Sequence, residues 1–93
     1  PIFIAHGGAD SSVSLDDVAT LAEELETAGV TYEIGIYSGA PHAFSVFGSD
    51  AYHERADQRS WATFNVWLEE MFYSSWFYSS CGYHSPHLQK ASV

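Results

Sequence analysis

An aspartate and a histidine are the residues of this sequence whose types and positions best suit proton-transfer chemistry. Asp10 closes the segment "HGGAD", and His42 lies in the segment "GAPHAF". A carboxylate hydrogen-bonded to an imidazole fixes the tautomer of the ring and stabilises the imidazolium that forms when the ring takes up a proton. Such a pair is the acid and the general base of a nucleophile–histidine–acid triad. The elements that would bring the two side chains together are therefore the next question.

Two predicted strands would place these residues side by side. Residues 1–5 form a contiguous apolar run typical of a buried strand, and residues 31–37 alternate in polarity as a strand does. Between them, residues 15–28 space their apolar side chains as one face of a helix. A strand, a helix and a strand make a βαβ unit with parallel strands and a right-handed crossover. Parallel neighbours lie about 4.8 Å apart, and α/β sheets carry their sites beyond the carboxyl ends of the strands. We therefore expect Asp10 and His42 to meet there.

Capping residues mark the predicted helix boundaries. Ser14 is a good N-cap for the first helix, and Asp17, three residues later, completes a capping box. Gly29 is suited to end that helix in a left-handed conformation. A second helix is predicted over about residues 50–72, with Asp50 as its cap.

Length and charge limit the classes of protein that this sequence can represent. Ninety-three residues make one domain at most. Three Lys and Arg residues against twelve Asp and Glu give a net charge of −9, which argues against nucleic acid and anionic membranes as partners. No apolar run approaches the roughly 18 residues of a membrane helix, and no signal-peptide pattern is present. These features predict a cytoplasmic protein.

Residues 73–93 show neither helical nor strand periodicity and are left unassigned. Cys81 is the single cysteine, which rules out an internal disulfide and a thiolate-rich metal site. His84 and His87 form an H-x-x-H pair, but Pro86 lies between them and the other ligands of a zinc site are missing. We predict no metal and no organic cofactor.

Three segments resemble the dienelactone hydrolase family of the α/β-hydrolase fold: "PIFIAHGGAD", "AGVTYEIGIYSGAPHAF" and "YHERADQRSWATFNVWL". The resemblance covers residues 1–72 and implies the C-terminal part of an α/β-hydrolase domain, whose parent is a three-layer sandwich with parallel strands. It implies that Asp10 is the triad acid and His42 the general base of an enzyme acting on a small ester or lactone. The family's nucleophile, a Cys or Ser in a Gly-x-Cys/Ser-x-Gly elbow, precedes both residues, and this sequence has no such elbow. Since Pro1 leads straight into a strand, we interpret the sequence as a fragment of a longer hydrolase.

Each of these residues also has a purely structural interpretation. Asp10 taken alone would be a turn residue, and His42 taken alone would be a packed loop histidine. His6 and the two glycines after it have the composition of an oxyanion loop, but no nucleophile elbow follows them. We therefore assign His6 to packing at the strand end and the glycines to a tight turn.

Two further residues are candidates for contact with a substrate. Phe44, with Phe47, would line an apolar acyl pocket near His42, or else pack in the core. Arg59 on the second helix would bind a substrate carboxylate bidentately, or else form an ion pair with Asp57, Glu54 or another exposed carboxylate.

The sequence leaves three functional hypotheses open. The first is a fragment of an ester or lactone hydrolase that works through a covalent acyl intermediate. The second is a catalytically inert truncated relative or an interaction module, which would self-associate through an exposed sheet edge. The third is a carboxylesterase or an oligopeptidase-like hydrolase of the same fold.

Overall fold

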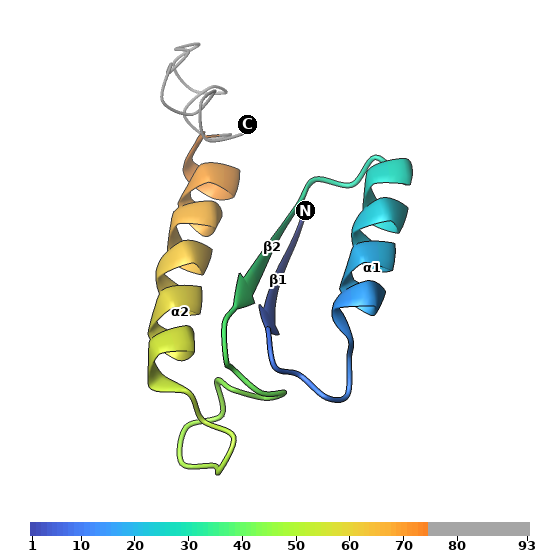
Figure 1. Cartoon of the computed structure of the whole chain (residues 1–93). Helices are drawn as coiled ribbons and strands as arrows, with labels where there is room; N and C mark the ends of the chain where they lie inside the picture. Colours follow the sequence, from blue (N-terminus) through green and yellow to red (C-terminus); the bar gives the residue numbers. More distant parts are fainter. Residues whose placement is uncertain (75–93) are drawn as a thin grey trace. The chain divides into compact units, whose positions relative to one another are not determined.

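A computed structural model describes residues 1–74 of the chain (Figure 1). The elements follow in the order β1, α1, β2, α2, and a π-helical turn at Glu70–Ser74 comes last. The chain divides into two compact units, Pro1–Ala62 and Thr63–Val93, which are described separately below. The predicted tail, residues 73–93, lies almost entirely outside the described residues.

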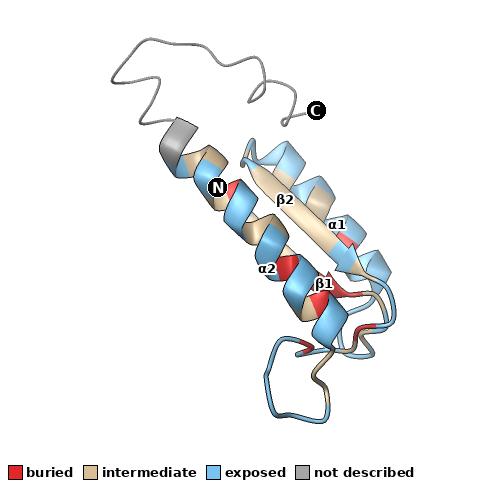
Figure 2. Ribbon diagram, turned by 90° about the vertical axis from the view of Figure 1, so that its left-hand side faces the viewer, coloured by how far each residue is buried: buried red, intermediate tan, exposed pale blue. Residues whose placement is uncertain are grey.

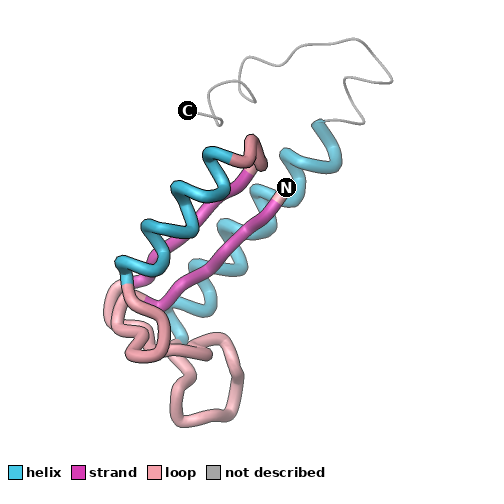
Figure 3. The backbone as a smooth tube through the Cα atoms, turned by 90° about the vertical axis from the view of Figure 1, so that its right-hand side faces the viewer, coloured by secondary structure: helices cyan, strands magenta, loops and turns pink. Residues whose placement is uncertain are grey.

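The sheet consists of two parallel strands, β1 (Ile2–Gly7) and β2 (Tyr32–Tyr37), as predicted. The register pairs Gly7 with Tyr37, so the two strands end level with each other. The loops that follow them gather at one end of the sheet (Figure 3). The prediction that the first strand spans residues 1–5 is wrong by two residues at its end, because backbone pairing with β2 continues beyond the apolar run. Within residues 1–74 each strand has only the other as its hydrogen-bonded neighbour.

Helix α1 (Leu15–Thr27) begins at the predicted capping box. The backbone N–H of Asp17 donates to Ser14 Oγ at 3.1 Å, and the Ser14 N–H donates back to Asp17 Oδ2 at 3.2 Å. Gly29 follows the helix with a φ of 71°, the left-handed conformation that the sequence predicted for it. These local signals fix the length of the crossover that carries the chain from β1 to β2.

Helix α2 (Glu54–Glu69) begins four residues later than predicted, and Asp50 is not its cap. His53 takes that position: its carbonyl accepts from the Asp57 N–H at 2.9 Å, and its Nδ1 accepts from the Ala56 N–H at 3.2 Å. Asp50 lies in a turn closed by a bond from the Tyr52 N–H to the Ser49 carbonyl, so its backbone cannot start the helix. None of the helices described through residue 74 is long and apolar enough to cross a membrane.

The core of the first unit lies beneath the loop that follows β2. Ala40 and Ala56 have no exposed surface, Phe44 is 5% exposed, and Tyr37 packs against this cluster. The rings of Tyr37 and Phe44 are 5.7 Å apart and tilted by 53°. Figure 2 shows buried residues both near the end of β1 and in the first turns of α2. The loop between β2 and α2 is therefore anchored to the helix that follows it.

In the second unit, the described residues belong to the later turns of α2 and the π-helical turn. The rings of Phe64 and Trp67 stack there with centroids 5.9 Å apart.

Candidate active site

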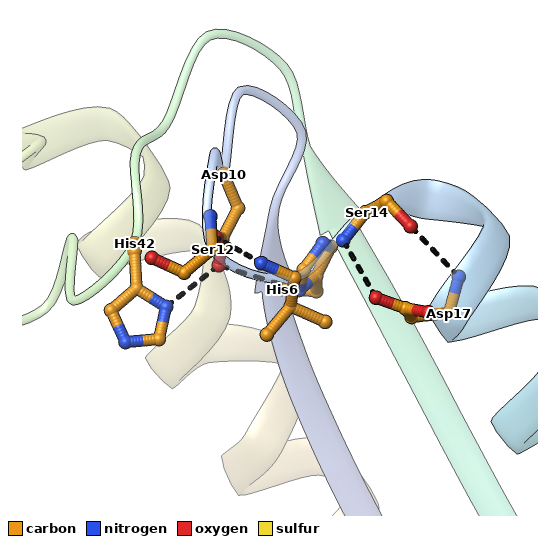
Figure 4. Close-up of polar contacts among 7 residues, drawn as sticks. His6, Asp10, Ser12, Ser14, Asp17 and His42 are labelled. Atoms are coloured by element: carbon orange, nitrogen blue, oxygen red, sulfur yellow. Dashed lines mark hydrogen bonds and ion pairs between the residues drawn. The ribbon is translucent and has the colours of Figure 1, made fainter.

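Asp10 lies in the tight loop that follows β1, and its own backbone hydrogen bonds set its orientation. The Asp10 N–H donates to the Gly7 carbonyl at 3.1 Å. One carboxylate oxygen, Oδ1, accepts from the N–H groups of Ser12 at 2.7 Å and Val13 at 2.9 Å (Figure 4). Short Asp side chains commonly bond to the backbone two or three residues ahead in this way. The second oxygen, Oδ2, is left to accept another donor.

His42 supplies that donor from the loop that follows β2. Its Nδ1 lies 2.8 Å from Asp10 Oδ2. Because an ionised carboxylate can only accept, Nδ1 must carry the proton, which leaves a lone pair on Nε2 of the neutral ring. The Asp10 side chain is 4% exposed and the His42 side chain is 59% exposed. Figure 4 shows the second ring nitrogen of His42 turned away from Asp10. The buried Asp10 carboxylate thus holds the accessible His42 ring in the tautomer with its proton on Nδ1.

The surroundings keep Asp10 ionised. Burial of the carboxylate acts to raise its pKa, but three hydrogen bonds together outweigh this effect. The strongest comes from the Val13 N–H, the next from His42 and the weakest from the Ser12 N–H. The proximity of His42 lowers the pKa further by charge attraction. The net result is a pKa lowered from 3.8 to about 2. The carboxylate is therefore charged at any pH at which His42 can act as a base.

Two backbone hydrogen bonds join the loops that carry this pair. The Gly8 N–H donates to the Tyr37 carbonyl at 2.7 Å, and the Ala9 N–H donates to the Ala40 carbonyl at 2.9 Å. They continue the pairing of β1 with β2 past the end of the sheet. The separation of Asp10 and His42 is consequently set by backbone contacts as well as by their side chains.

His6 lies closer to Asp10 than the sequence suggested. It is buried at the end of β1, in keeping with packing, but its Nδ1 is also 3.9 Å from Asp10 Oδ2. That distance is too long for a hydrogen bond. Its Nε2 is buried and has no hydrogen-bond partner among residues 1–74. The predicted position at the strand end is confirmed, since β1 includes His6, but the sequence did not predict that its ring lies near the Asp10 carboxylate.

The two predicted substrate contacts lie on different elements: Phe44 is in the loop that also carries His42, and Arg59 is on α2. Phe44 packs into the core cluster, which favours the packing alternative for this ring. Arg59 lines a surface pocket of about 290 Å³ on α2 together with Glu54, Arg55 and Gln58. Neither Asp10 nor His42 is among the residues that line it.

No metal site is found in the part of the chain that the structure covers. No group of three or more His, Cys, Asp and Glu side chains in residues 1–74 is arranged to hold an ion. Cys81, His84 and His87 lie outside the described residues.

Comparisons with known proteins identify the fold and the family of the chain. The chain is 30% identical over 70 residues to proteins named "Putative carboxymethylenebutenolidase" from Salmonella typhimurium and from Escherichia coli K12, and the match covers 75% of this chain and 26% of each relative. The fold matches a crystal structure named "Putative Dienelactone Hydrolase" from Klebsiella pneumoniae with a TM-score of 0.65 and 32% identity, over 71% of this chain and 27% of that one. The chain thus spans about a quarter of the length of these relatives, and its parallel strands and helices are part of an α/β-hydrolase fold. A family model described as the dienelactone hydrolase family matches residues 1–72, and the chain belongs to that family.

Proposed function

We propose that Asp10 and His42 are the acid and the general base of a hydrolase that cleaves a small ester or lactone. The observation that carries the proposal is the 2.8 Å bond between His42 Nδ1 and Asp10 Oδ2, which leaves a basic Nε2 on an accessible ring. Family membership supports the reaction class, because the relatives are named as lactone-cleaving enzymes.

In this proposal His42 Nε2 takes the proton of a Cys or Ser nucleophile as that nucleophile attacks the substrate carbonyl. Asp10 stabilises the resulting imidazolium, and the ring then gives its proton to the leaving oxygen. Water completes the cycle by hydrolysing the acyl intermediate, with His42 again acting as base. The 93 residues contain no Gly-x-Cys/Ser-x-Gly elbow, so the proposal places the nucleophile in another part of the parent protein.

Arg59 carries the substrate-binding part of the proposal. It and Arg55 lie one helical turn apart on α2 and line the same pocket. The Arg59 guanidinium would bind a substrate carboxylate there, in a pocket that Glu54 and Gln58 also line. Phe44 is too deeply buried to offer much surface to a ligand, and we propose that it supports the site by anchoring the loop that follows His42.

The test uses the full-length protein that contains this chain, assayed with p-nitrophenyl acetate, an unsubstituted lactone and a peptide amide. We expect Asp10→Asn to lower kcat about 10⁴-fold, because the wrong His42 tautomer is then favoured. His42→Ala should be at least as severe. His53→Asn is the matched control, because Asn is a good N-cap and the change removes a histidine outside the pair. Full activity in His42→Ala would refute the proposal, and preferred cleavage of the peptide would favour the oligopeptidase-like alternative.

An inert relative or interaction module is the second candidate, and the missing elbow favours it for the isolated chain. We expect the 93 residues alone to show no turnover. Because each strand has only the other as its strand neighbour within residues 1–74, the outer edges of this sheet would promote self-association, which light scattering after size-exclusion chromatography would measure. Turnover by the isolated chain would exclude this candidate, and a monomer at high concentration would exclude association through the edge.

A further inference from the structure

Gly7, the last residue of β1, lies unusually close to the backbone that precedes His42. A Cβ atom built on Gly7 would overlap the Ala40 carbonyl oxygen, and it would lie 2.6 Å from the Pro41 oxygen and 2.9 Å from the Ala40 carbon. Real Cβ atoms essentially never approach other atoms within 3.0 Å. We infer that Gly7 is a positioning residue for the Asp10–His42 pair, because its missing side chain sets how closely the two loops approach.

The contact involves backbone atoms on both sides, so a rotamer change cannot relieve it. Ala40 is completely buried in the cluster with Phe44 and Ala56, which hinders its retreat from Gly7. Pro41 has a fixed φ, which limits how the chain between Ala40 and His42 can adjust. An added methyl group would therefore push the two loops apart.

The site is sensitive to such a displacement. Gly7 accepts the Asp10 N–H at 3.1 Å, which links it to the acid. Its close approach to Ala40 and Pro41, the two residues before His42, links it to the other member of the pair. Good N–H···O bonds span only about 2.7–3.2 Å. A displacement of a few tenths of an ångström is enough to take the bond between Asp10 and His42, now 2.8 Å, out of that range.

Steric contact with the Ala40 and Pro41 backbone is by itself a sufficient reason for glycine at position 7. Within residues 1–74 the glycines with positive φ are Gly29, Gly39 and Gly48, and Gly7 is not among them. An alanine at position 7 would thus suffer no backbone strain of the left-handed kind. Gly48 is the opposite case, with a φ of 85° and no atom within 4 Å of the place that a Cβ would occupy. Alanine there would strain the backbone without touching the paired loops.

These opposite cases give a matched pair of variants, Gly7→Ala and Gly48→Ala. In the 93-residue chain, ¹⁵N NMR of the imidazole reports the His42 tautomer and its Nδ1 proton. We expect Gly7→Ala to lose the Nδ1–H signature while circular dichroism shows a folded chain. Gly48→Ala should keep the signature although the left-handed backbone at position 48 destabilises the folded chain. A wild-type imidazole spectrum in Gly7→Ala, or an equal loss in both variants, would overturn the inference.

Trimethylamine N-oxide favours compact states and would be added if Gly7→Ala does not fold in buffer alone. A variant that folds there without the His42 signature supports the inference. A variant that stays unfolded overturns it, because the methyl group would then disrupt the whole unit and not the pair.

The inference rests on the proposed function for its catalytic meaning. In the full-length enzyme, misplacing the base by a fraction of an ångström to about 1 Å should lower kcat by up to about 10²-fold, with KM little changed. The two ideas fail separately. Activity in His42→Ala would refute the proposed function, whereas an unchanged His42 spectrum in Gly7→Ala would refute only the role of Gly7.

Discussion

Replacing His42 by alanine should raise the pKa of Asp10. The wild-type value is lowered from 3.8 to about 2 by hydrogen bonds that outweigh burial, and His42 supplies one of them. This lowering means roughly 60-fold weaker proton binding to the carboxylate. In His42→Ala the N–H groups of Ser12 and Val13 still donate to Asp10 Oδ1. We therefore expect a pKa between about 2 and 3.8.

The same change should alter the acid sensitivity of the fold. A carboxylate whose pKa is lower in the folded state stabilises that state above its unfolded pKa, and this stabilisation is lost as the pH falls through the folded pKa. For Asp10 the loss falls between pH 3.8 and about 2. In His42→Ala the folded-state pKa of Asp10 should be higher, so the pH range over which its stabilisation is lost should begin above pH 2 and be narrower. Asp10→Asn should remove the pH-dependent stabilisation by this side chain altogether.

The assay is ¹³C NMR of the Asp10 carboxyl carbon as a function of pH, combined with urea unfolding between pH 2 and pH 5. Asp10→Asn assigns the resonance, and His53→Asn controls for loss of a histidine elsewhere. A midpoint that is the same in His42→Ala and in the wild type would show that His42 does not stabilise the charged form. A wild-type midpoint near 3.8 would show that the hydrogen bonds to Asp10 do not lower its pKa, which would refute the reasoning.

Three further predictions concern the scaffold, each measured by urea unfolding at pH 7. Ser14→Ala removes the hydroxyl that caps α1 and should cost about 1 kcal/mol; a change of only a few tenths would mean that water replaces the cap. Tyr52→Phe deprives Asp57 of a 2.9 Å hydrogen bond and should cost about 1–3 kcal/mol, and an unchanged midpoint would contradict this. Phe44→Ala opens a cavity beside Ala40 and should cost about 3–5 kcal/mol, whereas a cost similar to that of Phe44→Leu would show that the loop collapses into the space.

The sequence predicted the parts of the fold that depend on local patterns. The alternation of residues 31–37 and the capping box at Ser14 each have a direct physical cause, and both appear in the structure. The meeting of Asp10 and His42 followed from topology, since parallel neighbours end at the same edge. Their hydrogen bond is present, and their catalytic roles remain predictions.

Other features of the structure depend on contacts that local sequence patterns do not predict. The start of α2 shifted because a turn holds Asp50, while His53, an uncommon cap, accepts the Ala56 N–H. The closeness of His6 to Asp10 was not predicted because it depends on how the tight loop after β1 turns back, with the Asp10 N–H bonded to the Gly7 carbonyl. The crowding at Gly7 arises between segments far apart in the sequence, so composition alone cannot reveal it.

The level ends of β1 and β2 also bear on the order of events during folding. Asp10 and His42 are separated by 32 positions, and the pairing of β1 with β2 brings the loops that carry them to the same end of the sheet. The entropic cost of closing such a loop grows only slowly with its length, and α1 shortens the search by forming locally. The hydrogen-bonded pair would thus acquire its geometry as soon as β1 and β2 pair, early in the folding of this part of the chain.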